Sequence, residues 1–235
     1  MPPYQLKFPY ICDVYEKEAP IDWAGMDPKP YRAILKASGK FSDGVRRQDL
    51  EVENYVAQCK ELGIRYGLYH FLRPDNISEQ AQLFWDVWNK VGGADMPPIL
   101  DVEIDLKTLK KKKGKTFKGE DWAHHIKTWL SLIENRSGQK PIIYTSQQYW
   151  IETFDRLGNP PSWTDDYPLW VAWYPDLEFV DANSVPPKSM MPAGWTKWAL
   201  WQYNDTGIPD GYLANDLNTI SPDFAAQLDA QDSAD

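Results

Sequence analysis

The sequence predicts an α/β fold, an irregular (β/α) barrel in which helices are missing between the last strands. Over the first 145 residues, short apolar runs alternate with segments of helical periodicity, which is typical of parallel α/β architecture. In the last third, strand-like runs continue, but the proline-rich stretch 175–195 between two of them has no helical period. Carboxylates also recur near the ends of the predicted strands, where a barrel of this kind carries its functional residues.

The strands are predicted from apolar runs bounded by glycine, proline or polar residues. In chain order, the predicted strands cover 8–14, 31–37, 64–71, 99–103, 141–145, 169–174, 197–203 and 214–218. Apolar residues at helical spacing predict helices over 49–62, 78–91 and 120–135. Ser38 and Gly39 are typical of a turn, Gly63 stops the first helix, and Ser78 is the expected N-cap of the second.

Size and composition indicate one large domain. The chain has 235 residues, of which 43% are hydrophobic and 25% charged. We expect a single barrel domain over 1–235, with its core at about 8–220 and a frayed tail over 225–235. Cys12 and Cys59 have no metal-ligand or redox-motif spacing and are expected to be buried free thiols, the alternative being a disulfide.

Net charge and hydropathy limit the classes of partner that we expect for this protein. The net charge of −9 argues against nucleic-acid binding, which requires a positive surface. No apolar run is long enough for membrane insertion, and the first ten residues lack the pattern of a secretory signal. The expectation is a monomer that is made in the cytoplasm.

The stretch 97–103, Pro-Pro-Ile-Leu-Asp-Val-Glu, contains the strongest candidate site. A proline pair supplies no ladder donors and suits the entry of a strand. In an extended strand Asp101 and Glu103 share one face, with Cα atoms roughly 6.6 Å apart. Each charge then raises the cost of ionising the other. Such a pair is costly unless it is used, so we interpret it as catalytic; the alternative is an ion-pair site at a strand end.

Asp13 and Asp216 lie on two other predicted strands. Strand alternation turns Cys12 and Val14 toward the helices and Asp13 into the barrel mouth. Asp216 lies between two asparagines and is alternatively a turn residue that bonds local backbone. Polar and aromatic residues at other strand ends complete the candidate substrate-binding set: Tyr69, His70, Tyr144, Trp173, Gln202 and Tyr203. The aromatic members fit either sugar contacts or plain core, and His70 fits a structural role equally well.

Acids and aromatic rings gathered in one cleft are what glycoside hydrolysis requires. One acid must stay protonated to assist the leaving oxygen, and charge must stabilise an oxocarbenium-like transition state. The chain also has twelve Trp and thirteen Tyr, and flat aromatic rings suit stacking on sugars.

Short motifs along the chain carry a family resemblance. They are Cys-Asp-Val at 12–14, Ile-Asp-Trp at 21–23, Leu-Lys-Ala-Ser at 35–38, Tyr-His-Phe at 69–71, Leu-Asp-Val-Glu at 100–103, Ile-Tyr-Thr-Ser at 143–146, Leu-Trp-Val-Ala at 169–172, Trp-Gln-Tyr at 201–203 and Asn-Asp-Leu-Asn at 215–218. In this order they resemble the glycoside hydrolase family 25 lysozymes, the N-acetylmuramidases found in phage endolysins and bacterial autolysins. The resemblance extends from about Phe8 to Ile220 and implies a TIM-like barrel.

The resemblance also implies a reaction, cleavage of the β-1,4 bond between N-acetylmuramic acid and N-acetylglucosamine in peptidoglycan, without metal or organic cofactor. By the family pattern Glu103 is the general acid, and Asp101 orients the substrate N-acetyl group, which participates in the reaction. Asp13 and Asp216 match the family's other two acids. The implied partner is the glycan strand of the cell wall, reached by phage release or another export route. The rival functions are a chitin-type glycosidase and a non-catalytic glycan-binding or phage structural barrel.

Three loops depart from the family pattern or add to it. Tyr15 to Glu18 replaces the usual Ser and Trp-Gln, and Lys36 to Lys40 replaces Lys-Ala-Thr-Glu-Gly, so substrate contacts in these loops are expected to differ. The stretch from Lys107 to Lys118 contains seven lysines. It is either a solvated insertion or a surface that attracts anionic wall polymer.

Overall fold

The computed structural model describes residues 10–41, 44–104, 119–154, 160–176, 180–181, 183–206 and 216–233. The strands in these ranges are β1 (Ile11–Val14), β2 (Arg32–Lys40), β3 (Arg46–Gln48), β4 (Arg65–Phe71), β5 (Ile99–Asp101), β6 (Ile142–Ser146), β7 (Leu169–Ala172), β8 (Leu200–Asn204) and β9 (Asp216–Ile220). The α-helices are α1 (Val52–Leu62), α2 (Ile77–Val91), α4 (Gly119–Ser137), α5 (Gln147–Phe154) and α6 (Pro222–Asp232).

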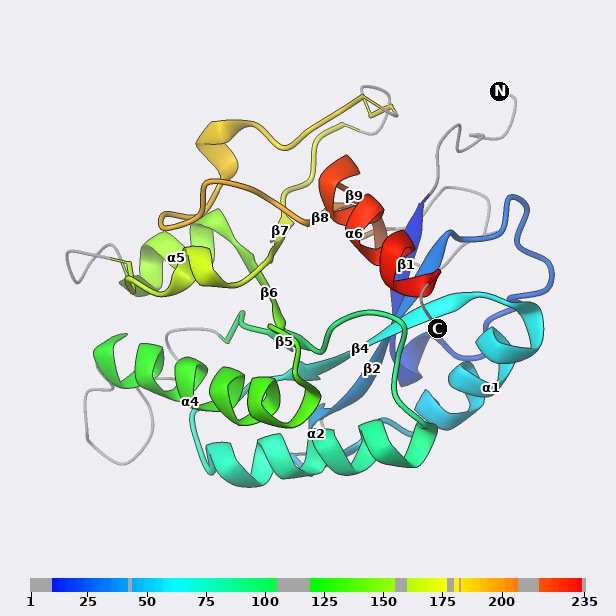
Figure 1. The fold of residues 1–235 in the computed structure, drawn as a ribbon, viewed down its shortest axis with the longest axis horizontal. Helices are drawn as coiled ribbons and strands as arrows, with labels where there is room; N and C mark the ends of the chain where they lie inside the picture. The colour runs from blue at the N-terminus through cyan, green and yellow to red at the C-terminus, as the bar shows by residue number, and fades with distance from the viewer. Residues whose placement is uncertain are drawn as a thin grey trace.

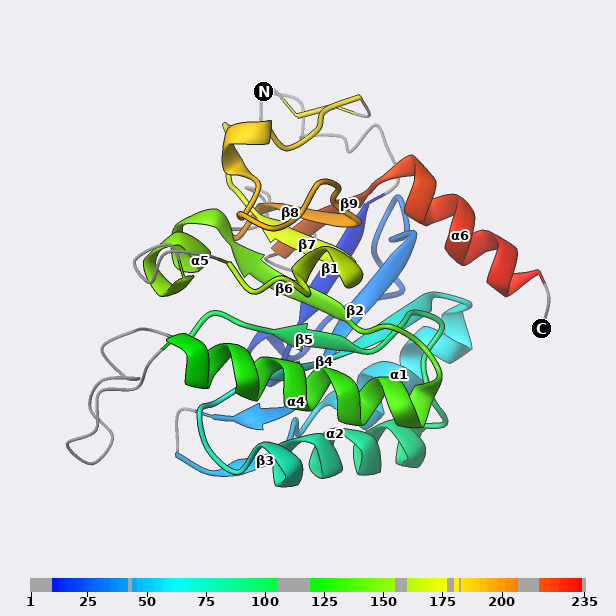
Figure 2. The same ribbon diagram turned by 60° about the vertical axis from the view of Figure 1, so that its left-hand side comes forward.

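Eight of the nine strands close into a barrel, as predicted. Their order is β1-β9-β8-β7-β6-β5-β4-β2, and the pairing of β1 with β2 completes the ring. Neighbours are parallel except at β9, which runs antiparallel to both β8 and β1. The short strand β3 lies outside the ring, antiparallel to the end of β2. Figure 2 shows the row of strands from β8 to β4.

Helices cover the barrel unevenly. In Figures 1 and 2, α2 and α4 lie side by side along one flank of the strands, and α1 continues this cover beside β2 and β4. Between β7 and β8 the described residues form only a 3-10 turn at Lys188–Met190. The predicted loss of a crossover helix is therefore confirmed for the part of this connection that the structure describes.

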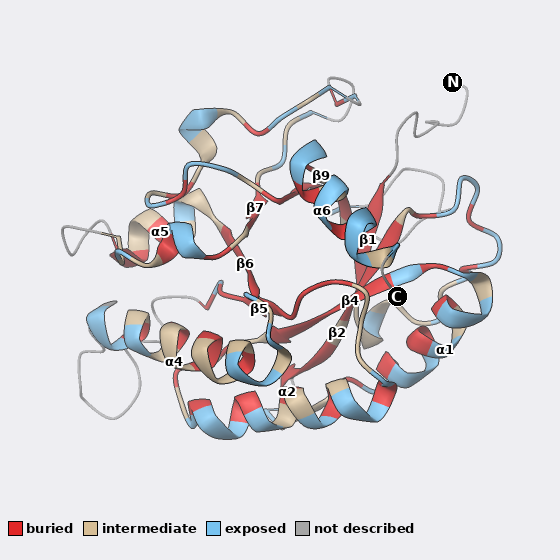
Figure 3. Ribbon diagram, viewed as in Figure 1, coloured by how far each residue is buried: buried red, intermediate tan, exposed pale blue. Residues whose placement is uncertain are grey.

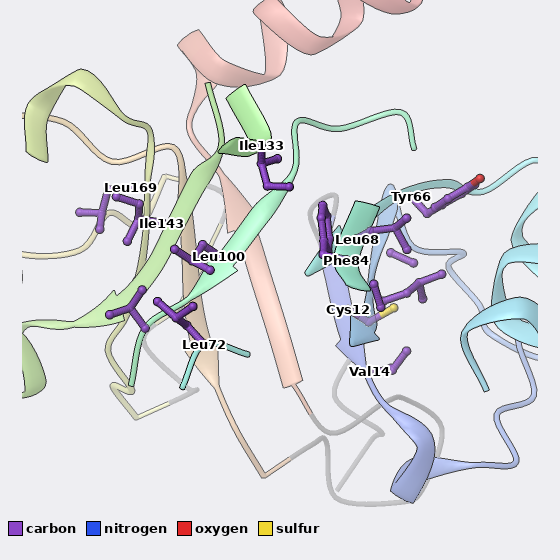
Figure 4. Close-up of a cluster of buried hydrophobic side chains, with 14 of the residues drawn as sticks. Cys12, Val14, Tyr66, Leu68, Leu72, Phe84, Leu100, Ile133, Ile143 and Leu169 are labelled. Atoms are coloured by element: carbon purple, nitrogen blue, oxygen red, sulfur yellow. The ribbon is translucent and has the colours of Figure 1, made fainter. Parts of the chain in front are cut away.

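The core has two layers that follow strand alternation. Ile11 belongs to the cluster inside the barrel, together with residues such as Ile34 and Leu200. Cys12 and Val14 belong to the larger cluster between the strands and the helices. Figure 4 shows part of this outer cluster, and Figure 3 shows that the helices turn their buried sides to the strands. The prediction for Cys12 and Val14 is confirmed, and both cysteines are free and buried.

The predicted turn at Ser38 and Gly39 is wrong, because β2 continues to Lys40. The pairing of β2 with β4 shifts register between Lys36 and Ser38, which marks a bulge. A Cβ atom on Gly39 would lie 3.0 Å from Cβ of Phe71. Glycine therefore serves a close approach of two strands here and does not end one.

Several element boundaries also differ from the predictions. Helix α2 begins at Ile77 after Asn76, which has a left-handed backbone (φ 48°), so Ser78 is not the N-cap. Strand β5 ends at Asp101, two residues before Glu103. Two short elements, β3 and α5, were not predicted.

The C-terminal segment is helical where a frayed tail was expected. The side chain of Ser221 accepts a hydrogen bond from the backbone of Phe224, and Pro222 opens α6. Phe224 and Leu228 pack against the cluster inside the barrel. Ordering therefore continues through Asp232, while the lysine-rich stretch 107–118 lies outside the described residues.

Candidate active site

Strand direction brings Asp13 and Asp216 together. Asp13 is the third residue of β1, and Asp216 is the first residue of β9. The two are paired in the β1–β9 register. Because β9 is antiparallel, its first residue lies at the barrel end where the parallel strands finish, which we call the mouth. Two carboxylates separated by most of the chain thus become neighbours there.

Gln202 of β8 connects these acids to the aromatic residues of the mouth. Its Nε2 atom donates to Oδ2 of Asp13 at 3.0 Å and to Oδ2 of Asp216 at 3.4 Å. Its Oε1 atom accepts from the hydroxyls of Tyr144, at 2.6 Å, and Tyr174, at 2.7 Å. Every hydrogen-bonding group of the Gln202 side chain is therefore used, which fixes the orientation of its amide.

Asn218 supplies a second amide to Asp13. Its Nδ2 atom donates to Asp13 Oδ2 at 2.6 Å, and its Oδ1 atom accepts from the indole of Trp170 at 2.8 Å. Burial raises the pKa of Asp13 to about 6, although the amides of Asn218 and Gln202 oppose the rise. Burial and the charge of Asp13 raise the pKa of Asp216 to about 9. Both shifts favour one proton shared by the two carboxyl groups at neutral pH.

Asp101 and Glu103 lie on the barrel side of their segment, as predicted. Leu100, Val102 and Ile104 all pack into the outer cluster, so the two acids alternate to the opposite side. The backbone beyond β5 stays bonded to its neighbours, since Val102 N–H donates to the Tyr144 carbonyl at 2.9 Å.

The environments of these two acids differ. Asp101 is only 6% exposed, and its Oδ1 atom has no hydrogen-bond partner among the described residues. Glu103 is exposed. Burial and then the charge of Glu103 raise the pKa of Asp101 well above its usual range. Partial desolvation and the charge of Asp13 also raise the pKa of Glu103. Asp13 therefore acts electrostatically on both Asp101 and Glu103, in addition to its pairing with Asp216.

Three of the predicted site residues are directed elsewhere. His70 is fully buried: Ser38 Oγ lies 2.8 Å from its Nδ1, Gln80 Oε1 lies 3.2 Å from its Nε2, and its ring stacks on Trp129. Burial lowers its pKa to about 3, so it stays neutral at ordinary pH.

Trp173 and Tyr203 belong to the outer face of their strands. Trp173 stacks on Trp201 with ring centres 5.5 Å apart, and Tyr203 is fully buried against the same tryptophan. Both therefore pack among the outer-cluster residues, on the other side of the sheet from Gln202.

Tyr174, Asn218, Lys36 and Arg73 are site residues that the sequence prediction missed. Tyr174 and Asn218 bond the site directly, and alternation from Ala172 and from Asp216 points to both. Lys36 and Arg73 oppose the rise in the pKa of Asp101 and of Glu103, and Lys36 lies beside Tyr69 in the β2–β4 register. Their place beside the acids depends on how distant segments meet, which no local pattern reveals.

A cavity of about 420 Å³ lies at the other end of the barrel, beside Tyr66 and 92–95. Polar groups in its wall bond one another: Lys60 Nζ donates to the Val91 carbonyl at 2.7 Å, and the Tyr66 hydroxyl donates to the Gly93 carbonyl at 2.9 Å. The described residues contain no cluster of three or more side chains suited to hold a metal ion. Among them, too, none of the helices combines the length and apolarity needed to cross a bilayer.

The chain is similar in sequence to known proteins. A family model described as glycosyl hydrolases family 25 matches residues 12–212. YegX of Escherichia coli O6:H1, described as uncharacterized, is 30% identical over 203 residues, covering 85% of this chain and 64% of YegX. Lysozyme M1 of Streptomyces globisporus is 25% identical over 203 residues, covering 85% of this chain and 63% of the lysozyme. The chain thus spans a little under two thirds of the length of both relatives.

A solved structure is similar to this chain in fold. The spore cortex lytic enzyme SleM of Clostridium perfringens matches with a TM-score of 0.72 at 26% identity, over 93% of this chain and 70% of that one.

Proposed function

The chain belongs to glycosyl hydrolase family 25, and on that premise we propose that it is a peptidoglycan hydrolase of the lysozyme type. It cleaves the β-1,4 bond between N-acetylmuramic acid and N-acetylglucosamine and acts at the bacterial cell wall. The names of its relatives and the gathering of four acids at one end of the barrel support this proposal.

In the proposed reaction Glu103 is the general acid. It donates its proton to the glycosidic oxygen while the bond from that oxygen to C1 of muramic acid breaks. The carbonyl oxygen of the substrate's own N-acetyl group attacks C1, and Asp101 accepts a hydrogen bond from the amide N–H. Water then attacks C1 and gives a proton to the Glu103 carboxylate while the bond from C1 to the acetyl oxygen breaks, which restores both the acid and the N-acetyl group.

The observation that carries this assignment is the contrast between a buried Asp101 with an unpaired oxygen and an exposed Glu103. A buried carboxyl oxygen without a partner is costly, and an arriving amide N–H would recover that cost. In the free protein burial favours the proton on Asp101. A substrate amide favours the ionised Asp101, and the proton is then available at Glu103, beside the leaving oxygen.

Asp13, Asp216 and Gln202 support the sugar in this proposal. Asp13 is held by two amides, and Tyr174 is 44% exposed although its hydroxyl bonds Gln202. The exposed ring of Tyr174 offers a surface for a sugar, and the acids offer acceptors for its hydroxyls.

The direct test is Glu103→Gln, assayed as release of soluble muropeptides from purified sacculi. We expect a loss of at least about 100-fold in turnover, because general acid catalysis typically contributes that much. Glu61→Gln is the matched control, since Glu61 is an exposed residue of α1 and is expected to keep full activity. Near-normal release by the Glu103 variant, with both variants folded, would overturn the assignment.

A parallel assay on chitin oligosaccharides separates the rival enzyme. Release from sacculi without turnover of chitin supports the proposal. Turnover of chitin alone would make the protein a chitin-type glycosidase, and binding of either polymer without turnover would make it a non-catalytic barrel.

A further inference from the structure

The ammonium group of Lys36 lies inside a cage of aromatic rings at the barrel mouth. Its Nζ atom lies 5.0 Å from the ring centre of Phe41, 5.1 Å from those of Tyr15 and Phe71, and 5.5 Å from that of Tyr69. These rings come from the segment after β1, the residue that follows β2 and the strand β4. A cation this close to a ring face is attracted by the ring quadrupole. Four such contacts hold the charge in one place.

No carboxylate among the described residues forms a direct ion pair with Lys36. Its charge nevertheless acts on several groups. Asp101, Asp49 and Glu103 stabilise the ammonium electrostatically, whereas burial and the charge of Arg73 lower the pKa of Lys36. Lys36 is thus a caged cation beside Asp101, because Phe71, one ring of its cage, is paired with Asp101 in the β4–β5 register.

Besides Lys36, two further charges of opposite sign act on both Asp101 and Glu103. Asp13 adds negative charge from β1. Arg73 is the other cation that opposes it, and its guanidinium lies 4.6 Å from the ring centre of Phe71. Burial of Asp101, its repulsion from Glu103 and the charge of Asp13 all favour the protonated forms of the pair, whereas Lys36 and Arg73 favour ionisation.

We propose that Lys36 is a positioning residue whose caged ammonium keeps the Asp101–Glu103 pair at one proton in the working pH range. This inference rests on the proposed function, because the reaction needs Glu103 protonated and Asp101 free to accept from the substrate amide. With two protons Asp101 offers that amide only the neutral carbonyl oxygen of a carboxylic acid, a weaker acceptor than a carboxylate, and with none the pair has no acid.

The test is the pH dependence of kcat/KM for Lys36→Met and Lys36→Gln on a soluble peptidoglycan fragment. Loss of the positive charge makes ionisation of the pair harder, so the acidic limb of the profile moves to higher pH by about one unit. Activity near pH 5 then falls about tenfold more than activity near pH 8. Lys36→Arg retains the charge and the position of the limb.

Lys40→Met is the matched control, because it removes a lysine from the same strand four residues away. We expect its acidic limb to coincide with that of the wild type. If kcat/KM of Lys36→Met and Lys36→Gln falls by the same factor at every pH, the acidic limb has not moved. Lys36 is then merely structural, and the inference is wrong.

A measurement on the intact wild type keeps the inference testable if the Lys36 variants do not fold. The charge of Lys36 is followed by NMR of the lysine Cε and Nζ atoms through the acidic limb. A charged Lys36 throughout supports the inference, and a neutral one overturns it. Absence of any wild-type activity would instead refute the proposed function, and the NMR result would still stand.

Discussion

Asp13 and Asp216 form a carboxyl pair in which burial works against ionisation. The raised pKa of each, about 6 and about 9, means that the folded protein binds more protons than the unfolded chain, in which an aspartate has a pKa of about 3.9. The stability that these protons contribute is fully present below about pH 4. It is lost as pH rises through the folded pKa values, so the pair weakens the fold at neutral and mildly alkaline pH.

Asp216→Asn should therefore stabilise the protein in a pH-dependent way. The amide is neutral and can donate to Asp13, so the variant avoids the cost of a second buried charge. We expect a gain of at least about 1 kcal/mol in the free energy of unfolding near pH 8, shrinking toward pH 4. Urea titrations at three pH values measure it. A difference between variant and wild type that does not change with pH would refute the shared-proton account.

For single residues, position at a predicted strand end identifies most of the candidate site. The alternation of side chains along the strand then decides which residues at that end belong to the site. Asp13, Asp101 and Gln202 are visible as polar residues in apolar strands. Position at a strand end also selects Trp173 and Tyr203. Both are one residue away from the positions whose side chains point into the mouth, so they pack on the outer side of the strands. The cage around Lys36 was not predictable, because its rings come from three separate segments.

Helix α6 forms ion pairs with two strands at the end of the barrel opposite the mouth. Arg32, at the start of β2, is fully buried, and its Nη2 lies 2.5 Å from Asp232 Oδ2 and 3.4 Å from Asp229 Oδ1. Arg65 of β4 reaches Asp232 Oδ1 at 2.6 Å. Asp232 thus bonds two strands at once and is only 11% exposed, whereas Asp229 is 60% exposed.

These two aspartates form a matched pair for mutation. Asp232→Asn leaves a buried guanidinium without its main counter-charge and should cost about 3 kcal/mol of folding free energy. Asp229→Asn removes an exposed partner of the same atom and should cost under about 1 kcal/mol. Chemical denaturation compares them, and muropeptide release should stay unchanged in both. If both variants lose the same small amount of folding free energy, the ion pair of α6 with Arg32 does not stabilise the barrel.

The sequence already contained a signal for α6. Ser221 followed by Pro222 is a typical helix start, with an N-cap and a proline at the first position. The Ala-, Gln- and Asp-rich composition after it suggested a tail, because α6 buries only Phe224 and Leu228. Too few apolar residues remain to produce a periodic pattern. Tertiary packing and the ion pairs of Asp232 with Arg32 and Arg65 stabilise this helix more than its own sequence does.

Over the whole molecule, the ion pairs of α6 and the proposed catalytic groups lie at opposite ends of one closed barrel. The proposed catalytic groups gather where the parallel strands finish, and α6 with its ion pairs holds the other end. The barrel class was predictable from the alternation of strands and helices and from their loss in the last third. The antiparallel direction of β9 was not predictable, because a short strand pattern is the same in both directions. That direction is what brings Asp216 to Asp13.

The most direct test of the central claim is identification of the new reducing ends that the wild type produces from purified sacculi. The products are reduced with borohydride, and the reduced sugar of each released fragment is identified by mass spectrometry. Cleavage after N-acetylmuramic acid predicts that the new ends are muramic acid, and that Glu103→Gln generates almost none. New ends at N-acetylglucosamine, or no new ends from an intact, folded protein, would contradict it.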